Sequence, residues 1–466
     1  MSTLGLVSQS LGTDEPQLAI IVVGASVALF AGGATPAALL IAAVGFGGFL
    51  YLVAKFSGIV GDAGGLYTIA TEGLGRRAGA MTGWFMISAF MLSVPGLFIA
   101  AGFLAQAFFN AVAPGVWILS GQWALWTIVL TVAGLFIVFR GVSFSVKLLL
   151  AMTLVGMLAL VIFDFAILFQ GGASGIAWNS LMPWKLSGIS MTALLAGLGL
   201  AVYTLGGLEG AVYLAEEANA PTRTVPRAVF ISAGIAYGFF ILTALAIVSG
   251  YGVDAVGAEW SSKASGVLLD LSSRYLFPGY GYVLLAMVAL SGFTVAVANA
   301  NGIVRLLYSW ARSGFLPAAL ARSHHRFRTP HIATAALGAA VAIALAVLYT
   351  WQGGSAAGGF NAFTWLSLTG VFGQLLAYAM VGIAGFVYGR RHGKGLVFTY
   401  VAPALCVAVM GLALCTYFIP SLPVAPFTAT PFVGAAIAVV GIIYVSVKSR
   451  DASRGLPAPA PANMSN

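Results

Sequence analysis

Long apolar segments, separated by short polar ones, fill most of this chain. An apolar run of about 20 residues with few charges is long enough to cross the hydrocarbon core of a bilayer as a helix. The pattern predicts an all-α membrane protein with about twelve transmembrane helices. The expected spans are 4–32 (interrupted), 36–56, 79–109, 121–140, 144–170, 189–216 (interrupted), 226–250, 279–310, 331–351, 361–389, 396–420 and 429–448. We expect a surface helix in the longest connection, 251–278.

The positions of the basic residues predict the orientation of these helices. If the N-terminus is cytoplasmic, all of the 21 Lys and Arg residues face the cytoplasm except Lys185, Lys263 and Arg274. An excess of Lys and Arg marks cytoplasmic loops. We therefore expect a multi-pass protein of the cell (inner) membrane with both termini in the cytoplasm. Residues 451–466, rich in Pro, Ala and Ser, are expected to form a disordered cytoplasmic tail.

Composition excludes several classes of protein. Sixty per cent of the residues are hydrophobic and 7% are charged, whereas soluble domains carry about 25% charged residues. The net charge of +9 does not indicate nucleic-acid binding, because the basic residues lie at the ends of apolar runs. No motif of an enzyme, a metal site or a cofactor site is present. We expect a lipid bilayer and a small molecule as partners, with no cofactor and no enzymatic activity.

Two of the predicted spans are interrupted by residues that disfavour a continuous helix. The first contains 12–16 (Gly-Thr-Asp-Glu-Pro), and the sixth contains 206–210 (Gly-Gly-Leu-Glu-Gly). Unwound backbone at membrane depth is tolerated where it lines a cavity or is buried in protein. An alternative for the first break is a surface loop, with the true span beginning near Leu18.

Breaks at matching positions of two halves indicate an inverted-repeat transporter with a central site. The predicted organisation is a first repeat of five helices, a second repeat of five, two further helices and a tail: 1–170, 189–389, 396–448 and 451–466.

Four stretches resemble motifs of the amino acid–polyamine–organocation superfamily, which includes bacterial amino acid permeases with a leucine-transporter-type fold. The stretch after the broken sixth span is the most specific. In two stretches the chain departs from the family pattern, with Asp62 in place of a proline and Ser313 in place of an acid. The first break also differs from the small-residue break that is usual in the family. The four stretches are 62–84, 207–228, 299–317 and 326–330.

The resemblance implies a secondary active transporter of amino acids or related amines that works by alternating access. It implies that backbone groups at the two breaks hold the carboxylate and the amine of the substrate. The candidate backbone ligands are Gly12, Thr13, Gly206 and Gly207. Tyr203, just before the second break, is either a lid over the substrate or a packing aromatic. A transporter of polyamines or cationic amines, and a non-transporting sensor with a transporter fold, are the alternatives.

Acidic residues inside a membrane span are costly and indicate function. Asp14 or Glu15 at the first break could meet a substrate ammonium. Glu209 matches an acid of the family motif, and we favour a hydrogen-bonding role for it over a protonation role. For Asp164 we favour a position near the outer interface over pairing with a polar neighbour or binding a proton. Glu217 is expected to pair with a loop arginine such as Arg223.

The coupling ion is less readable from the sequence. In sodium-coupled relatives, hydroxyl groups of the eighth helix help to bind the ion, and here Ser291 and Thr294 lie on that helix. The resemblance favours H+ coupling or exchange, with Na+ as the alternative. Candidate residues for coupling or gating are Glu209, Ser291 and Thr294.

Overall fold

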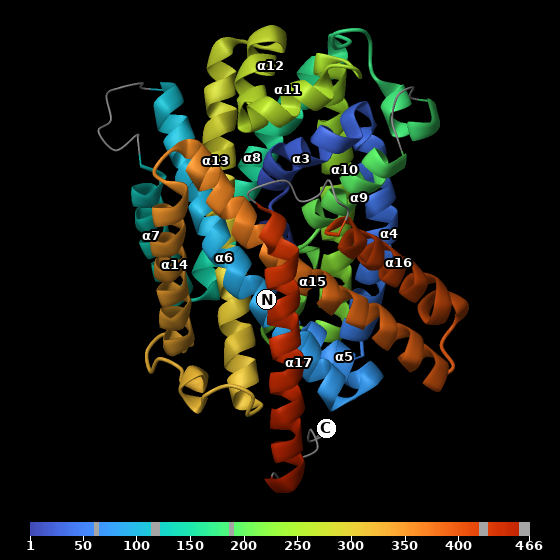
Figure 1. Cartoon of the computed structure of the whole chain (residues 1–466), viewed down its shortest axis with the longest axis vertical. Coiled ribbons are helices and arrows are strands. Elements are labelled where there is room, and N and C mark those ends of the chain that lie inside the picture. Colours follow the sequence, from blue (N-terminus) through green and yellow to red (C-terminus); the bar gives the residue numbers. More distant parts are fainter. Residues whose placement is uncertain (60–64, 113–121, 186–190, 419–426, 456–466) are drawn as a thin grey trace.

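The computed structural model describes residues 1–59, 65–112, 122–185, 191–418 and 427–455. In these residues the protein is entirely helical (Figure 1). Eleven helical stretches are long and apolar enough to cross a membrane. This confirms the all-α membrane architecture. Asp62 and residues 456–466 lie outside the described part.

The helical bounds agree with the expected spans to within a few residues. They are α1 (Thr3–Asp14), α2 (Pro16–Leu18) and α3 (Gly24–Ala31), α4 (Thr35–Ser57), α6 (Arg76–Val112), α7 (Trp123–Arg140), α8 (Val142–Phe169), α9 (Met191–Thr204) with the 3₁₀ segment η5 (Leu208–Glu217), α10 (Pro221–Tyr251), α13 (Pro278–Arg312), α14 (His331–Gln352), α15 (Ala356–Arg391), α16 (Ala402–Thr416) and α17 (Thr430–Gly455). The helix α17 therefore extends five residues into the expected tail.

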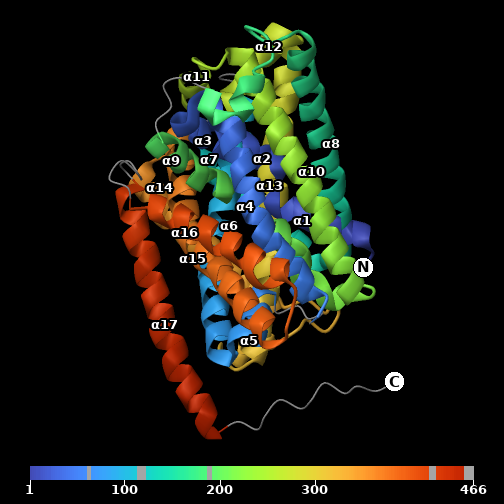
Figure 2. The ribbon, with the colours of Figure 1, turned by 90° about the vertical axis from the view of Figure 1, so that its right-hand side faces the viewer.

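The first of the eleven stretches contains two crossings. It runs over 55 residues, Thr3–Ser57, which is roughly 80 Å of helix at 1.5 Å per residue. The chain reverses between α3 and α4, where Gly32 has a φ of +51°, a conformation that glycine adopts without steric cost. Helix α4 then runs back along the bundle (Figure 2), packed against α9 and α10. Counting both crossings gives about twelve, as the sequence predicts.

The two broken helices lie at the centre of the bundle. Helix α3 packs against α9, and α1 packs against η5. The long helix α6 packs against both α13 and α15, and α13 also packs against α1. Helix α17 runs along the outside of the molecule (Figure 2). The outward faces of α7, α14 and α17 carry exposed apolar side chains such as Val132, Ile343 and Ile443, the surface expected against lipid.

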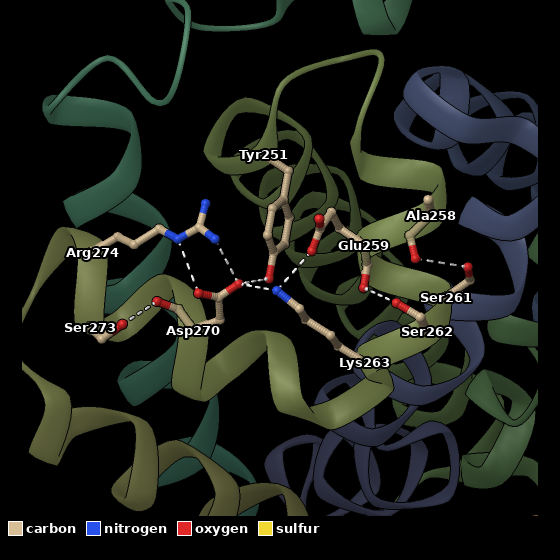
Figure 3. Close-up of polar contacts among 9 residues, drawn as sticks. All are labelled: Tyr251, Ala258, Glu259, Ser261, Ser262, Lys263, Asp270, Ser273 and Arg274. Atoms are coloured by element: carbon tan, nitrogen blue, oxygen red, sulfur yellow. Dashed lines mark hydrogen bonds and ion pairs between the residues drawn. The ribbon is translucent and has the colours of Figure 1, made fainter.

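The connection after α10 forms a cap at one end of the molecule, here named the α12 end. It contains α11 (Val256–Lys263) and α12 (Val267–Tyr275), so the expected surface helix is present as two short helices. Figure 3 shows Asp270 accepting hydrogen bonds from Lys263, from Arg274 Nε at 3.0 Å and from Tyr251 at 2.8 Å. Trp260 Nε1 donates to the Ile21 carbonyl at 3.2 Å and ties the cap to the first broken helix.

The opposite end, named the α5 end after α5 (Leu66–Leu74), is held by an ion pair. Glu217 of η5 pairs with Arg305 of α13. The expected pairing of Glu217 with Arg223 is therefore wrong, because the carboxylate reaches Arg305 of α13 instead.

We predict that Asp270→Asn loosens the cap. Partial burial alone would raise the pKa of Asp270, but hydrogen bonds from Lys263 and Tyr251 and the charge of Arg274 outweigh it and leave the pKa below 3.8. The ionised carboxylate thus stabilises the cap at neutral pH, and this contribution is lost as the pH falls through that lowered value. Hydrogen exchange of Val267–Tyr275 should quicken in Asp270→Asn at neutral pH, and not in Glu259→Gln, which removes a contact to Lys263 alone. Equal exchange in both variants would contradict the prediction.

Candidate functional site

The first break is a sharp turn buried inside the bundle. Helix α1 ends at Asp14, Glu15 adopts a left-handed conformation with a φ of +46°, and Pro16 begins α2. Residues 13–17 are at most 5% exposed. The freed N–H of Leu18 donates to Ser291 Oγ at 3.1 Å, which satisfies a backbone group left without a helical partner. This burial is incompatible with the alternative of a solvated surface loop.

The second break depends on glycine. Gly207 separates α9 from η5 with a φ of +115°, and a Cβ there would lie 2.8 Å from the Thr13 carbonyl oxygen. Glu209 folds back over the break: its Oε2 accepts from the Gly207 N–H at 3.1 Å and its Oε1 accepts from the Tyr378 hydroxyl at 2.5 Å. This is the geometry of the hydrogen-bonding role expected for Glu209.

The two breaks contact each other directly. Asn299 of α13 donates to the Thr13 carbonyl at 2.9 Å, and the Ala211 N–H of η5 donates to Ser10 Oγ at 3.0 Å. Backbone groups that the helices leave free are thereby paired across the interface, as burial in a membrane protein requires.

A small cavity of about 60 Å³ lies between the breaks. Five of the expected site residues line it: Thr13, Asp14, Tyr203, Gly206 and Gly207. The remaining backbone candidate, Gly12, is buried in α1 and is not among the lining residues.

Several cavity residues were missed from the sequence. Phe90 and Ser93 come from α6, and Phe363 and Gln374 come from α15. Gln374 has an amide side chain in the middle of a predicted span, and it is the residue among these four whose type could have indicated a buried polar site. The aromatic residues and Ser93 are ordinary in membrane helices and carried none.

Asp14 is the chemically distinctive group of the cavity. Its side chain is 5% exposed, and neither carboxylate oxygen has a hydrogen-bond partner. Glu15 and Glu209 are close enough to repel its charge. In the described part of the chain the buried ionisable acids are Asp14, Glu15, Asp164 and Glu209, and no Lys, Arg or His is buried with them. A buried carboxylate without a cation requires a proton, hydrogen-bond donors or a cationic ligand.

A larger cavity of about 250 Å³ extends from the site toward the α12 end. The two cavities share Val23, Tyr203 and Phe363. Ser261 and Ala264 of the cap line the outer part. Tyr203 therefore lies at the boundary between the two spaces, where an aromatic side chain separates them.

The other candidate residues lie away from the cavity. Ser291 and Thr294 of α13 face Glu15 and do not line the cavity. Asp164 is completely buried in α8 and accepts a hydrogen bond from Thr243 of α10 at 2.7 Å. Asp164 thus pairs with a polar neighbour inside the bundle, which was the alternative to the favoured position near the outer interface.

Comparison with known proteins identifies the family. The model of the family described as "Amino acid permease" matches residues 2–447. The chain belongs to this amino acid permease family. Its members and relatives are permeases and transporters rather than enzymes.

Three relatives are similar to this chain, and two of them are named for a substrate. An uncharacterised transporter of Mycobacterium tuberculosis is 28% identical over 255 residues, 55% of this chain and 51% of the relative. The chain thus spans about half the length of that relative. The branched-chain amino acid permease BcaP of Lactococcus lactis is 23% identical over 85% of this chain and 83% of its own. The low-affinity putrescine importer PlaP of Escherichia coli is 22% identical over 61% of each.

We predict that Gly207→Ala disrupts this permease. The substitution forces a Cβ to a positive φ against the Thr13 carbonyl, and such changes destabilise by more than about 1 kcal/mol. Gly238→Ala is the matched control, since a Cβ at this exposed position on α10 meets nothing within 4 Å. Thermal unfolding of the purified variants should show a lower midpoint for Gly207→Ala and no loss for Gly238→Ala. Equal midpoints would show that the close approach of the breaks is not required.

Proposed function

We propose that this permease is a secondary active transporter of amino acids or related amines, and that the substrate amino group binds Asp14. The observation that carries the proposal is the cavity between the two broken helices, which contains a buried carboxylate with no protein partner. A substrate ammonium would supply the missing positive charge.

The free carboxylate favours substrates with one ammonium group at the break. Glu209 is engaged by Tyr378 and by the Gly207 N–H, so Asp14 alone remains available. The N-terminus of η5 begins at Leu208, beside the same cavity, and helix N-termini favour anionic groups such as a carboxylate. An amino acid fits both features. A diamine would satisfy Asp14 and leave its second ammonium without a partner, so polyamines are the second candidate.

The transport cycle proposed here is alternating access. The protein lies in the inner membrane with its α5 end toward the cytoplasm. The placement of the basic residues favours this orientation. The described conformation has its larger cavity toward the α12 end and the Glu217–Arg305 ion pair at the α5 end. It thus corresponds to an outward-facing form. The first two helices of each five-helix repeat rock against the others around the site, with H+ coupling or exchange.

Ligand-dependent thermal stabilisation tests the amine proposal. The panel contains L-leucine, L-lysine, putrescine and 4-methylpentanoate, which is leucine without its amino group. A ligand at 100 times its Kd adds about 2.7 kcal/mol to stability. We expect stabilisation by at least one amino compound and none by 4-methylpentanoate. In Asp14→Asn the affinity should fall by roughly 30-fold, or about 2 kcal/mol.

Two controls separate the outcomes of this experiment. Asp164→Asn also removes a buried acid, but Asp164 pairs with Thr243 outside the cavity, so amine affinity should be unchanged. Amine affinity that is the same in Asp14→Asn and in the wild type would exclude Asp14 as the amine ligand. Binding in detergent without uptake into proteoliposomes would favour a sensor over a transporter.

A further inference from the structure

A second polar cluster lies at the first break, and its residues do not line the substrate cavity. It contains the carboxyl group of Glu15, which is 0% exposed. Thr153 of α8 donates to Glu15 Oε2 at 2.9 Å. Ser291 and Thr294 of α13 face the same carboxyl group, whereas the other oxygen, Oε1, has no hydrogen-bond partner.

The hydroxyl groups around Glu15 can serve both the ionised and the protonated acid. Ser291 Oγ accepts from the Leu18 N–H at 3.1 Å, so its own hydrogen is free to donate to a carboxylate. Thr294 donates its hydrogen to the Ser291 carbonyl at 2.9 Å, so its oxygen can only accept. A proton on Glu15 would give the carboxyl group a donor that Thr294 can accept.

The charges around Glu15 favour a bound proton. Asp14 is its neighbour in the chain, and Glu209 of η5 and Tyr237 of α10 face Asp14. The elements α8 and α13 present hydroxyl groups to Glu15. None of the buried side chains whose burial the structure describes is basic, so none of them neutralises two adjacent carboxylates. Protonation removes one of the two charges without a counter-ion.

We propose that Glu15 is the proton-binding residue that couples transport to a proton gradient. The inference rests on the proposed transport function. It assigns the coupling ion of that transport to a site distinct from the substrate cavity. Asp14 and Glu15 are consecutive, yet one lines the cavity and the other faces α8 and α13. The left-handed φ of +46° at Glu15 produces this division, and movement of the break would act on both groups together.

The proposed proton step is balanced. On the side of the α12 end, Glu15 takes up one proton from water and becomes a neutral carboxylic acid, while Asp14 stays ionised and binds the substrate ammonium. After the break moves, the O–H bond of Glu15 breaks and the proton passes to water on the side of the α5 end. The carboxylate that remains keeps the donors Thr153 and Ser291. One proton therefore crosses with each substrate molecule.

Proteoliposome assays with radiolabelled L-leucine and putrescine test the coupling. Accumulation is driven by an alkaline interior, and exchange is measured at equal pH against the same unlabelled compound. We expect Glu15→Gln, a permanently neutral variant, to lose about tenfold or more of the gradient-driven accumulation and to keep exchange. Asp164→Asn is the matched control and should keep both activities.

Infrared spectroscopy of the purified protein provides a second readout that needs no substrate. One component of the protonated carboxyl band, which disappears as the pH rises, should be present in the wild type and in Asp164→Asn, and absent in Glu15→Gln. Thr153→Val removes a donor to the ionised form, so the same band should persist to higher pH. This shift separates proton binding from a merely structural role.

The outcomes are distinguishable. Three results would each overturn the assignment of Glu15. They are an unchanged infrared titration in Glu15→Gln, accumulation in this variant equal to that of the wild type, and accumulation driven by a sodium gradient at equal pH. Absence of both exchange and accumulation in the wild type, with the Glu15 band present, would count against the proposed transport function and leave the proton site standing.

Discussion

Buried carboxylates without buried cations are the constraint on which this structure depends. Four acids lie inside the described bundle, and no basic side chain accompanies them. Charges at membrane depth are costly unless they are paired or neutralised. The acids meet the constraint to different degrees. Both oxygens of Glu209 accept hydrogen bonds. Asp164 and Glu15 each accept one and keep one oxygen without a partner, whereas both oxygens of Asp14 lack partners.

The same constraint explains the architecture around the breaks. Unwinding a membrane helix frees backbone groups that lipid cannot satisfy. Here the freed groups are paired by side chains from other helices, including Ser291 with the Leu18 N–H and Asn299 with the Thr13 carbonyl. Gly207 has no side chain, so the two breaks can approach closely enough for these hydrogen bonds to form. The site is thus supported by α13 and α15, which lie far from both breaks in sequence.

The sequence predicts features that arise from local composition. The helix bounds followed from apolar runs, and both breaks followed from glycine, proline and acids in unusual places. Hydrogen bonds between distant helices could not be predicted from the sequence. Nothing in the local sequence distinguishes a hydroxyl group that donates to an acid on another helix from one that donates to a carbonyl of its own helix. Thr153 and Tyr378 were missed for this reason. The contact of Asp164 with α10 was missed for the same reason, because its partner Thr243 is 79 residues away in the sequence.

Adjacent acids at the first break face different surroundings because of one backbone conformation. A left-handed conformation costs a residue with a side chain about 1 to 2 kcal/mol, and such strain persists where the surrounding structure enforces it. In a continuous helix, consecutive side chains point about 100° apart. The turn at Glu15 instead places Asp14 in the cavity and Glu15 among the hydroxyl groups of α8 and α13. A ligand charge at one residue and a proton at the next would then share a single peptide unit, so any movement of the break changes both environments at once.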